Sequence, residues 1–164
     1  MPFLCLPWRR RIRQSECRQV DSKQKGDITE IRCKLAFMEL GINVLDPYGD
    51  RERYDFVINI GGKFYRIQSK TSRAIDDGRA FQFNCKRSTR IHGRNADFGY
   101  TQDEIDYFVT AFDGKCYMVP VGECVYEKTL RLRPAIDKDS PRISWASDYE
   151  IEKIVASLKK SLHL

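Results

Sequence analysis

Two glycines, Gly61 and Gly62, separate two short runs that are rich in β-branched and aromatic residues. The first run, residues 54–60, reads YDFVINI, and the second, residues 64–70, reads FYRIQSK. Apolar runs on either side of a two-residue glycine turn predict the antiparallel strands of a β-hairpin. Because the turn is centred between the two glycines, residue 55 is expected to lie opposite residue 68.

Three polar side chains gather at the open end of this predicted hairpin. Asp55 lies across from Gln68, and Lys70, two residues further along, points to the same side as Gln68. Polar groups within apolar strands are costly unless they have partners, so their convergence favours a functional site. Hydrolysis of a phosphodiester needs a metal to neutralise charge and a cation or base to position water. Mg²⁺ retains several waters and takes one or two carboxylates, so a sparse set of ligands is expected.

The remaining elements follow from periodicity and turn residues. Before the hairpin, apolar residues recur at helical spacing from Gln24 and form one stripe of an amphipathic helix that Gly41 would end. The residues of this stripe are Ile28, Ile31, Leu35, Met38 and Ile42. After the hairpin we expect a strand at 80–85, a polar loop at 86–100, a second hairpin at 105–112 and 116–121, an irregular segment at 134–144 and a closing amphipathic helix at 148–162. This order predicts an α/β fold with a mixed sheet flanked by helices.

Residues 1–23 differ from the rest and include the run Arg9-Arg10-Arg11-Ile12-Arg13. We interpret them as a basic N-terminal extension of a single domain at 24–164, either an arm that contacts DNA or a disordered segment. The formal net charge of the chain is +6, which favours nucleic acid or an anionic membrane as partner, with simple solubility as the alternative. No run approaches the roughly 20 apolar residues that span a bilayer, so we expect no membrane partner.

The six cysteines have no CxxC spacing, and only two histidines could join them as ligands. Zinc sites need clustered ligands, so none is expected. The first residues lack the apolar core of a secretory signal. We therefore expect reduced, mostly buried cysteines in a cytoplasmic protein that associates with the nucleoid when it is bound to DNA.

Asp55, the hairpin and the Gln68-Ser69-Lys70 segment together resemble the core of the PD-(D/E)XK nuclease superfamily. The resemblance covers about residues 25–90, and more loosely extends to 121. It implies a restriction-endonuclease-like core. Glutamine in the (D/E) position is similar to intron-encoded homing endonucleases of this type. The segment Lys25–Glu30 also resembles the start of archaeal Holliday-junction resolvases.

The resemblance implies a role for each site residue. Asp55 would be the bridging metal ligand, and Gln68 a second ligand through its side-chain carbonyl. The backbone carbonyl of Ser69 would be a third ligand, and Lys70 would orient or activate water and steady the phosphate. Glu30 would reach the site from the first helix, directly or through a metal-bound water. The implied cofactor is Mg²⁺, for which Mn²⁺ could substitute.

Two positions depart from the family pattern. Tyr54 replaces the proline, which shapes the strand entry and has no chemical role. Gln68 replaces an acid and brings no charge to the metal, so Glu30 becomes more important as a partner.

Basic and amide residues cluster after the hairpin. Because phosphate contacts dominate affinity for nucleic acid, we expect this cluster to follow a DNA backbone, with a solvated charged face as the alternative. Some of its amides and arginines could also read base edges. The predicted DNA-binding residues are Lys25, Arg73, Gln82, Asn84, Lys86, Arg87, Arg90 and Arg94.

The expected function is therefore a Mg²⁺-dependent endonuclease for double-stranded DNA, site-specific and of the homing type. A structure-selective junction resolvase and a catalytically inactive DNA-binding module are the alternatives. A domain of this size offers one active site, so cutting both strands would require a homo-oligomer, either a dimer or a tetramer.

Overall fold

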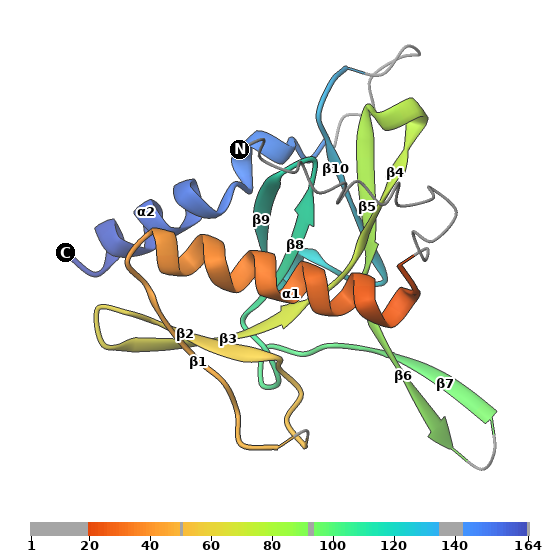
Figure 1. The fold of residues 1–164 in the computed structure, drawn as a ribbon, viewed down its shortest axis with the longest axis horizontal. Helices are drawn as coiled ribbons and strands as arrows, with labels where there is room; N and C mark the ends of the chain where they lie inside the picture. Colours follow the sequence, from red (N-terminus) through yellow and green to blue (C-terminus); the bar gives the residue numbers. More distant parts are fainter. Residues whose placement is uncertain (1–19, 50, 92–93, 135–142, 164) are drawn as a thin grey trace, which may run out of the picture.

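A mixed five-stranded sheet forms the centre of the computed structural model, which describes residues 20–49, 51–91, 94–134 and 143–163 (Figure 1). The strand order is β1-β2-β3-β8-β9; β3 and β8 are parallel, and the other neighbours are antiparallel. The bounds are β1 Asn43–Leu45, β2 Phe56–Ile60, β3 Lys63–Ser69, β8 Tyr107–Phe112 and β9 Lys115–Pro120. The predicted α/β class with a mixed sheet is confirmed.

The β2–β3 hairpin has the register that its glycine turn predicts. Phe56 pairs with Ile67 and Ile60 pairs with Lys63. The backbone N–H of Asp55 donates to the carbonyl of Ile67 at 2.8 Å and continues the ladder by one residue. Gly61 and Gly62 have φ values of 59° and 86°, a conformation that suits glycine and gives the tight turn its twist.

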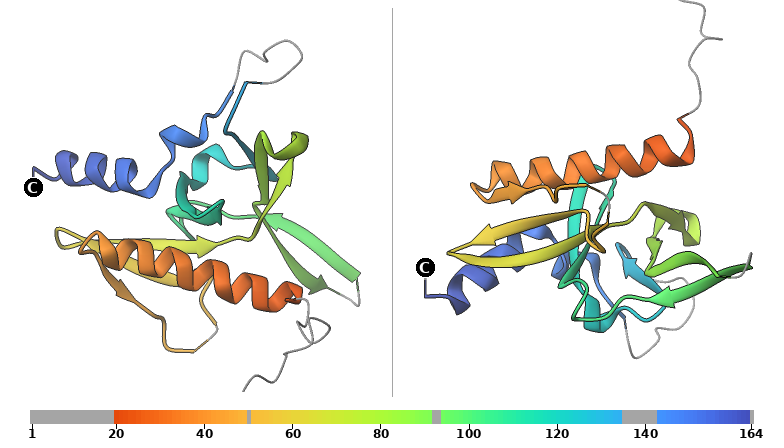
Figure 2. Two further views of the ribbon diagram at one scale, coloured as in Figure 1. Left: turned by 45° about the horizontal axis from the view of Figure 1, so that its top comes forward. Right: turned by 90° about the horizontal axis from the view of Figure 1, so that it is seen from below.

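Helix α1, Ser22–Glu39, covers one face of this sheet (Figure 2). It begins two residues before the expected start because the carboxylate of Asp21 accepts a hydrogen bond from the backbone N–H of Gln24 at 2.8 Å, forming an N-cap. The face that packs on the sheet contains the buried residues Thr29, Cys33 and Phe37.

The apolar stripe predicted for α1 lies on the wrong side for packing on the sheet. Ile28, Ile31, Leu35 and Met38 are 40%, 64%, 52% and 62% exposed. Of the predicted stripe, Ile42 is buried, and it lies beyond the helix. The face that packs on the sheet includes small and polar residues, so the stronger sequence signal came from the exposed face.

A second, three-stranded sheet packs against the other face of the central sheet at β8 and β9. Its order is β10-β5-β4, with bounds β4 Ser72–Ile75, β5 Ala80–Asn84 and β10 Glu127–Arg131. Phe81, Phe83 and Leu130 from this sheet form an apolar cluster with Phe108 and Tyr117 of the central sheet. The strand expected at 80–85 is confirmed; β4 and β10 were not expected.

Helix α2, Ile151–Ser161, closes the fold as predicted and packs against β9 and β2. Its buried residues Ile151 and Val155 join the same apolar cluster as Phe37 of α1 and Phe56 of β2. The short 3₁₀ helices are η2 Asp76–Gly78, η3 Val121–Glu123 and η4 Ala146–Asp148. Most of the segment expected to be irregular, residues 135–142, lies outside the described residues, as do residues 1–19 of the predicted extension.

The predicted loop at 86–100 is instead a two-stranded ribbon, β6 Lys86–Ile91 and β7 Arg94–Gly99, which projects from the body (Figure 1). Its cross-strand contacts are polar: the hydroxyl of Ser88 donates to Asp97 at 2.5 Å, and the guanidinium of Arg87 lies over the ring of Phe98. A strand without a core-facing side has no alternating apolar pattern, which is why the sequence indicated a loop. No helix in the described part of the chain is long and apolar enough to cross a membrane.

Candidate active site

The predicted partners Asp55 and Gln68 meet at the open end of the β2–β3 hairpin. Oδ2 of Asp55 accepts one hydrogen bond from the side-chain amide of Gln68 and one from the backbone N–H of Ser69, each at 2.7 Å. The hairpin ladder fixes the backbone on both sides of these contacts. The carboxylate is therefore held in one position against the end of β3.

Lys70 follows β3 directly, and its ammonium lies at the base of the ribbon, where β6 begins and β7 ends. Nζ donates to the carbonyl of Lys86 at 3.2 Å and to the hydroxyl of Tyr100 at 3.3 Å. Lys86 begins β6, and Tyr100 immediately follows β7. The ring of Tyr100 packs edge-on against Phe108 at 5.3 Å between centroids. Sequence reasoning missed Tyr100, since a lone tyrosine after a polar segment carries no signal of such a contact.

Burial shifts the pKa of both charged groups of the site, Asp55 and Lys70, in the direction that favours the neutral form. It raises the pKa of the Asp55 carboxyl; the hydrogen bond from Ser69 opposes this rise, and the charge of Glu30 adds to it. Burial also lowers the pKa of the Lys70 ammonium. Burial likewise raises the pKa of Tyr100, to about 12. An acid and a base that are both disfavoured in their charged forms are typical of catalytic sites.

Glu30 comes from α1 and lies close enough for its charge to raise the pKa of Asp55. Its carboxylate is 2.8 Å from the ammonium of Lys34, which also contacts Asp46 at 2.5 Å. The structure therefore brings Glu30 near the predicted site. In the arrangement seen here, its nearest charged partner is a lysine of its own helix.

The donor set fits a hard divalent cation. The amide nitrogen of Gln68 donates both to Oδ2 of Asp55 and, at 3.3 Å, to the backbone carbonyl of Ser69. Two of the predicted ligand oxygens thus face one side-chain amide. Rotating the Gln68 amide by half a turn exchanges its nitrogen for its carbonyl oxygen. The oxygens of Asp55, Gln68 and Ser69 would then converge, and Mg²⁺ prefers oxygen ligands. Within the described residues, no group of three or more His, Cys, Asp or Glu side chains is placed to hold a metal ion.

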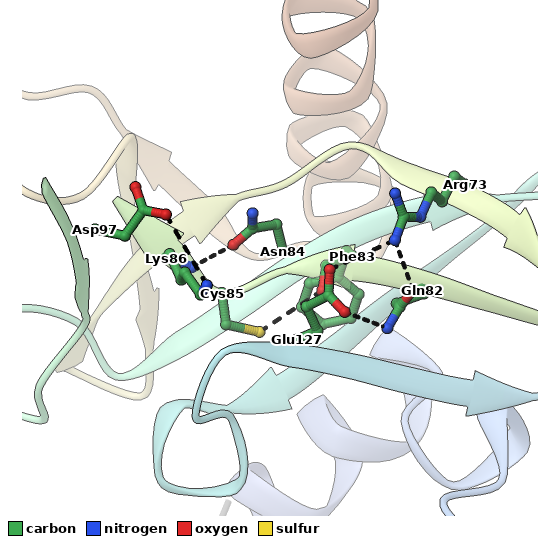
Figure 3. A network of polar contacts seen from close by, with 8 residues as sticks. All are labelled: Arg73, Gln82, Phe83, Asn84, Cys85, Lys86, Asp97 and Glu127. Carbon is green, nitrogen blue, oxygen red and sulfur yellow. Dashed lines mark hydrogen bonds and ion pairs between the residues drawn. The ribbon is translucent and has the colours of Figure 1, made fainter. Parts of the chain in front are cut away.

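Four of the predicted DNA-binding residues lie in two neighbouring groups of polar contacts on β4, β5 and the start of β6 (Figure 3). The guanidinium of Arg73 donates to Gln82 at 2.9 Å, and Gln82 in turn donates to Glu127 at 2.7 Å. The side-chain oxygen of Asn84 accepts from the backbone N–H of Lys86 at 2.7 Å. The acidic partner Glu127 comes from β10, a strand that the sequence did not indicate.

The other predicted DNA-binding residues lie on the ribbon and on α1. Arg87 pairs with Glu104 at 3.2 Å, whereas Arg94 is exposed. Arg90 lies opposite Asn95 in the ribbon, and its side chain is outside the described residues. Lys25 is exposed near the start of α1. The structure thus gathers most of the predicted set on the ribbon and the adjoining sheet, and leaves Lys25 on a separate element.

The sequence profile of the PD-(D/E)XK endonuclease family matches residues 20–152, which include Glu30, Asp55, Gln68 and Lys70. The chain belongs to this family. The resemblance given by the hairpin residues is therefore confirmed at the level of the family. PD-(D/E)XK endonucleases hydrolyse phosphodiester bonds in nucleic acid and generally use divalent metal ions.

The fold of this PD-(D/E)XK endonuclease is also found in a solved structure, that of the bacterial homing endonuclease I-Ssp6803I. The two share a TM-score of 0.69 and 23% sequence identity over 87% of this chain and 97% of that chain. At this identity the likeness establishes a shared fold. A comparison with curated proteins found no match.

Proposed function

We propose that this PD-(D/E)XK endonuclease is a Mg²⁺-dependent, site-specific enzyme of the homing type that cuts double-stranded DNA. The observation that carries the proposal is the fixed Asp55 carboxylate, with Gln68 and Ser69 each 2.7 Å from one of its oxygens and Lys70 beyond them. The shared fold with a bacterial homing endonuclease supports the homing type over a junction resolvase.

The proposed roles follow from the position of each group. Asp55, the side-chain carbonyl of Gln68 and the backbone carbonyl of Ser69 would hold the cation, and Glu30 would act directly or through a water. Such an ion, when bound, neutralises charge on the phosphate and lowers the pKa of water. Lys70 orients the attacking water and steadies the negative charge that develops on the phosphate. Water attacks phosphorus in line, the 3′ oxygen leaves and a 5′-phosphate remains.

The ribbon offers a means of holding DNA beside this site. A two-stranded antiparallel ribbon fits the major groove of B-DNA. Arg90 and Arg94 lie towards its tip, at the last residues of β6 and the first residue of β7. At the base of the ribbon, Lys70 contacts Lys86, where β6 begins, and Tyr100, which follows β7. DNA bound along the ribbon therefore leads towards the proposed active site.

The proposed enzyme acts as an assembly of identical chains. Each chain supplies one Asp55–Lys70 site, and the two strands of a duplex run in opposite directions. A symmetric dimer places a second site in the reversed orientation, and a tetramer can be built from two such dimers. We therefore propose a homo-oligomer of either kind.

Cleavage of a DNA pool tests this function directly. The purified protein is incubated with host DNA and Mg²⁺, with Mn²⁺ or with a chelator, and the ends of the products are sequenced; a four-way junction is assayed in parallel. We expect metal-dependent cuts at a recurring sequence with 5′-phosphate ends. Preferential cutting of the junction would show a resolvase instead. Binding without cutting in either metal would show an inactive DNA-binding module.

A further inference from the structure

Helix α1 has two apolar faces, of which the protein core uses one. Cys33 and Phe37 are fully buried against the central sheet. Four large apolar residues on the other face lie in solvent, at least two-fifths exposed: Ile28, Ile31, Leu35 and Met38. We call these four the α1 seam. An exposed row of this kind is uncommon on a soluble monomer and marks a binding surface.

The spacing of the α1 seam indicates what it binds. Successive seam residues are three, four and three positions apart, which is the a/d pattern of a heptad repeat. A narrow a/d stripe is the form of apolar face that packs against another α-helix. It differs from the wider stripe of a helix that packs on a sheet, and it carries no cation that would contact a DNA phosphate.

The charges that border the α1 seam fit a second copy of the same helix. One border has Asp27 and Lys34, and the other has Arg32 and Glu39. In a parallel pair, these positions place Asp27 against Arg32, and Lys34 against Glu39, of the second copy. In an antiparallel pair they place Asp27 against Lys34, and Arg32 against Glu39. Every contact joins opposite charges in both orientations.

These border charges are largely uncommitted within the chain. Asp27, Arg32 and Glu39 form no ion pair with another described residue, while Lys34 contacts Glu30 and Asp46. Asp27, Arg32 and Glu39 are all exposed. Among the described residues, three of the four border charges are therefore available for a complementary surface, and Lys34 would exchange its present partners for one on that surface.

We propose that the α1 seam is the surface through which two copies of this chain associate, with helix packing on helix. The inference rests on the proposed homo-oligomer and names the residues that form it. The helix that carries the seam also carries Glu30, which borders the active site, so the contact would join two chains through the helices beside their sites.

The mass of the full chain in solution, measured by light scattering after size exclusion and by sedimentation, tests this proposal. We expect an assembly of two or more chains for the natural protein and a smaller assembly for Leu35→Glu. Because Leu35 is exposed, the variant should keep its cooperative thermal unfolding. The matched control is Val125→Glu, which changes another exposed aliphatic residue, in the segment between η3 and β10, and should retain the full mass. A monomeric natural protein, or an unchanged mass for Leu35→Glu, would overturn the proposal.

Charge reversal separates the two orientations. Arg32→Glu should weaken association, because the introduced carboxylate would meet an acid of the second copy in either orientation. Adding Glu39→Lys restores association in an antiparallel pair, and adding Asp27→Lys restores it in a parallel pair. Restoration by neither change would contradict the α1 seam as the contact. These results are read from mass alone, so they stand apart from any failure to detect DNA cleavage.

Discussion

The β2–β3 hairpin and the β6–β7 ribbon are both two antiparallel strands, but they are stabilised in different ways. Phe56 and Ile58 of β2 are fully buried between the sheet and the helices. The ribbon instead relies on its backbone ladder and on polar pairs such as Ser88 with Asp97. The two meet at Lys70, which follows β3 and contacts Lys86 and Tyr100 at the base of the ribbon.

We infer from this difference that the hairpin provides a rigid site for catalysis and the ribbon an adaptable surface for binding DNA. A carboxylate that must hold a metal has to stay in position, and the buried hairpin fixes Asp55 from two sides. A surface that follows DNA gains from side chains that can rearrange in solvent. We therefore expect substitutions in the hairpin to change stability and chemistry, and substitutions in the ribbon to change binding.

The largest difference is expected in the free energy of unfolding. Ile58→Ala removes buried methyl groups at the middle of β2 and should cost about 2–5 kcal/mol. Thr89→Ala, at a middle position of β6, should cost less than about 1 kcal/mol. Denaturant unfolding of the two variants measures both values. Equal losses would show that the ribbon contributes to the core.

DNA affinity should respond to the ribbon. Replacing both Arg90 and Arg94 by alanine should weaken binding and reduce the slope of log affinity against log salt by about 1 for each phosphate that is no longer neutralised. The control is Lys153→Ala, an exposed charge on α2 that should leave the slope unchanged. Fluorescence anisotropy at several salt concentrations measures the slope. A slope that the ribbon substitutions leave unaltered would place the DNA elsewhere.

A smaller effect concerns the stability of the metal-free protein. Burial raises the folded-state pKa of Asp55, so its contribution to stability is full below the unfolded pKa and is lost as pH rises through the folded pKa. At neutral pH, Asp55→Asn should therefore raise the melting temperature by a few degrees, on the order of 2–4 °C. This gain should vanish in acid. Asp97→Asn in the ribbon, where the carboxylate is 53% exposed, should give no such gain.

The same contrast explains what the sequence could predict. The Gly61-Gly62 turn determined the hairpin register, so the proximity of Asp55 to Gln68 could be predicted from residue numbers alone. The ribbon could not be predicted, because its strands have no buried face. Tyr100 could not be predicted either, since its contact with Lys70 depends on where the ribbon returns to the body. On α1 the stronger apolar signal belonged to the exposed face, so periodicity indicated the helix but misplaced its core side.

The open end of the β2–β3 hairpin is the proposed place of DNA cleavage. The most direct test is the single-turnover rate of DNA cleavage in Mg²⁺ by Asp55→Ala and Lys70→Ala, with Lys63→Ala on the same hairpin as the control. We predict that each of the first two variants loses at least about 100-fold in rate while DNA binding and folding persist, and that the control cuts normally. Cleavage at the natural rate by folded Asp55→Ala or Lys70→Ala would contradict this claim.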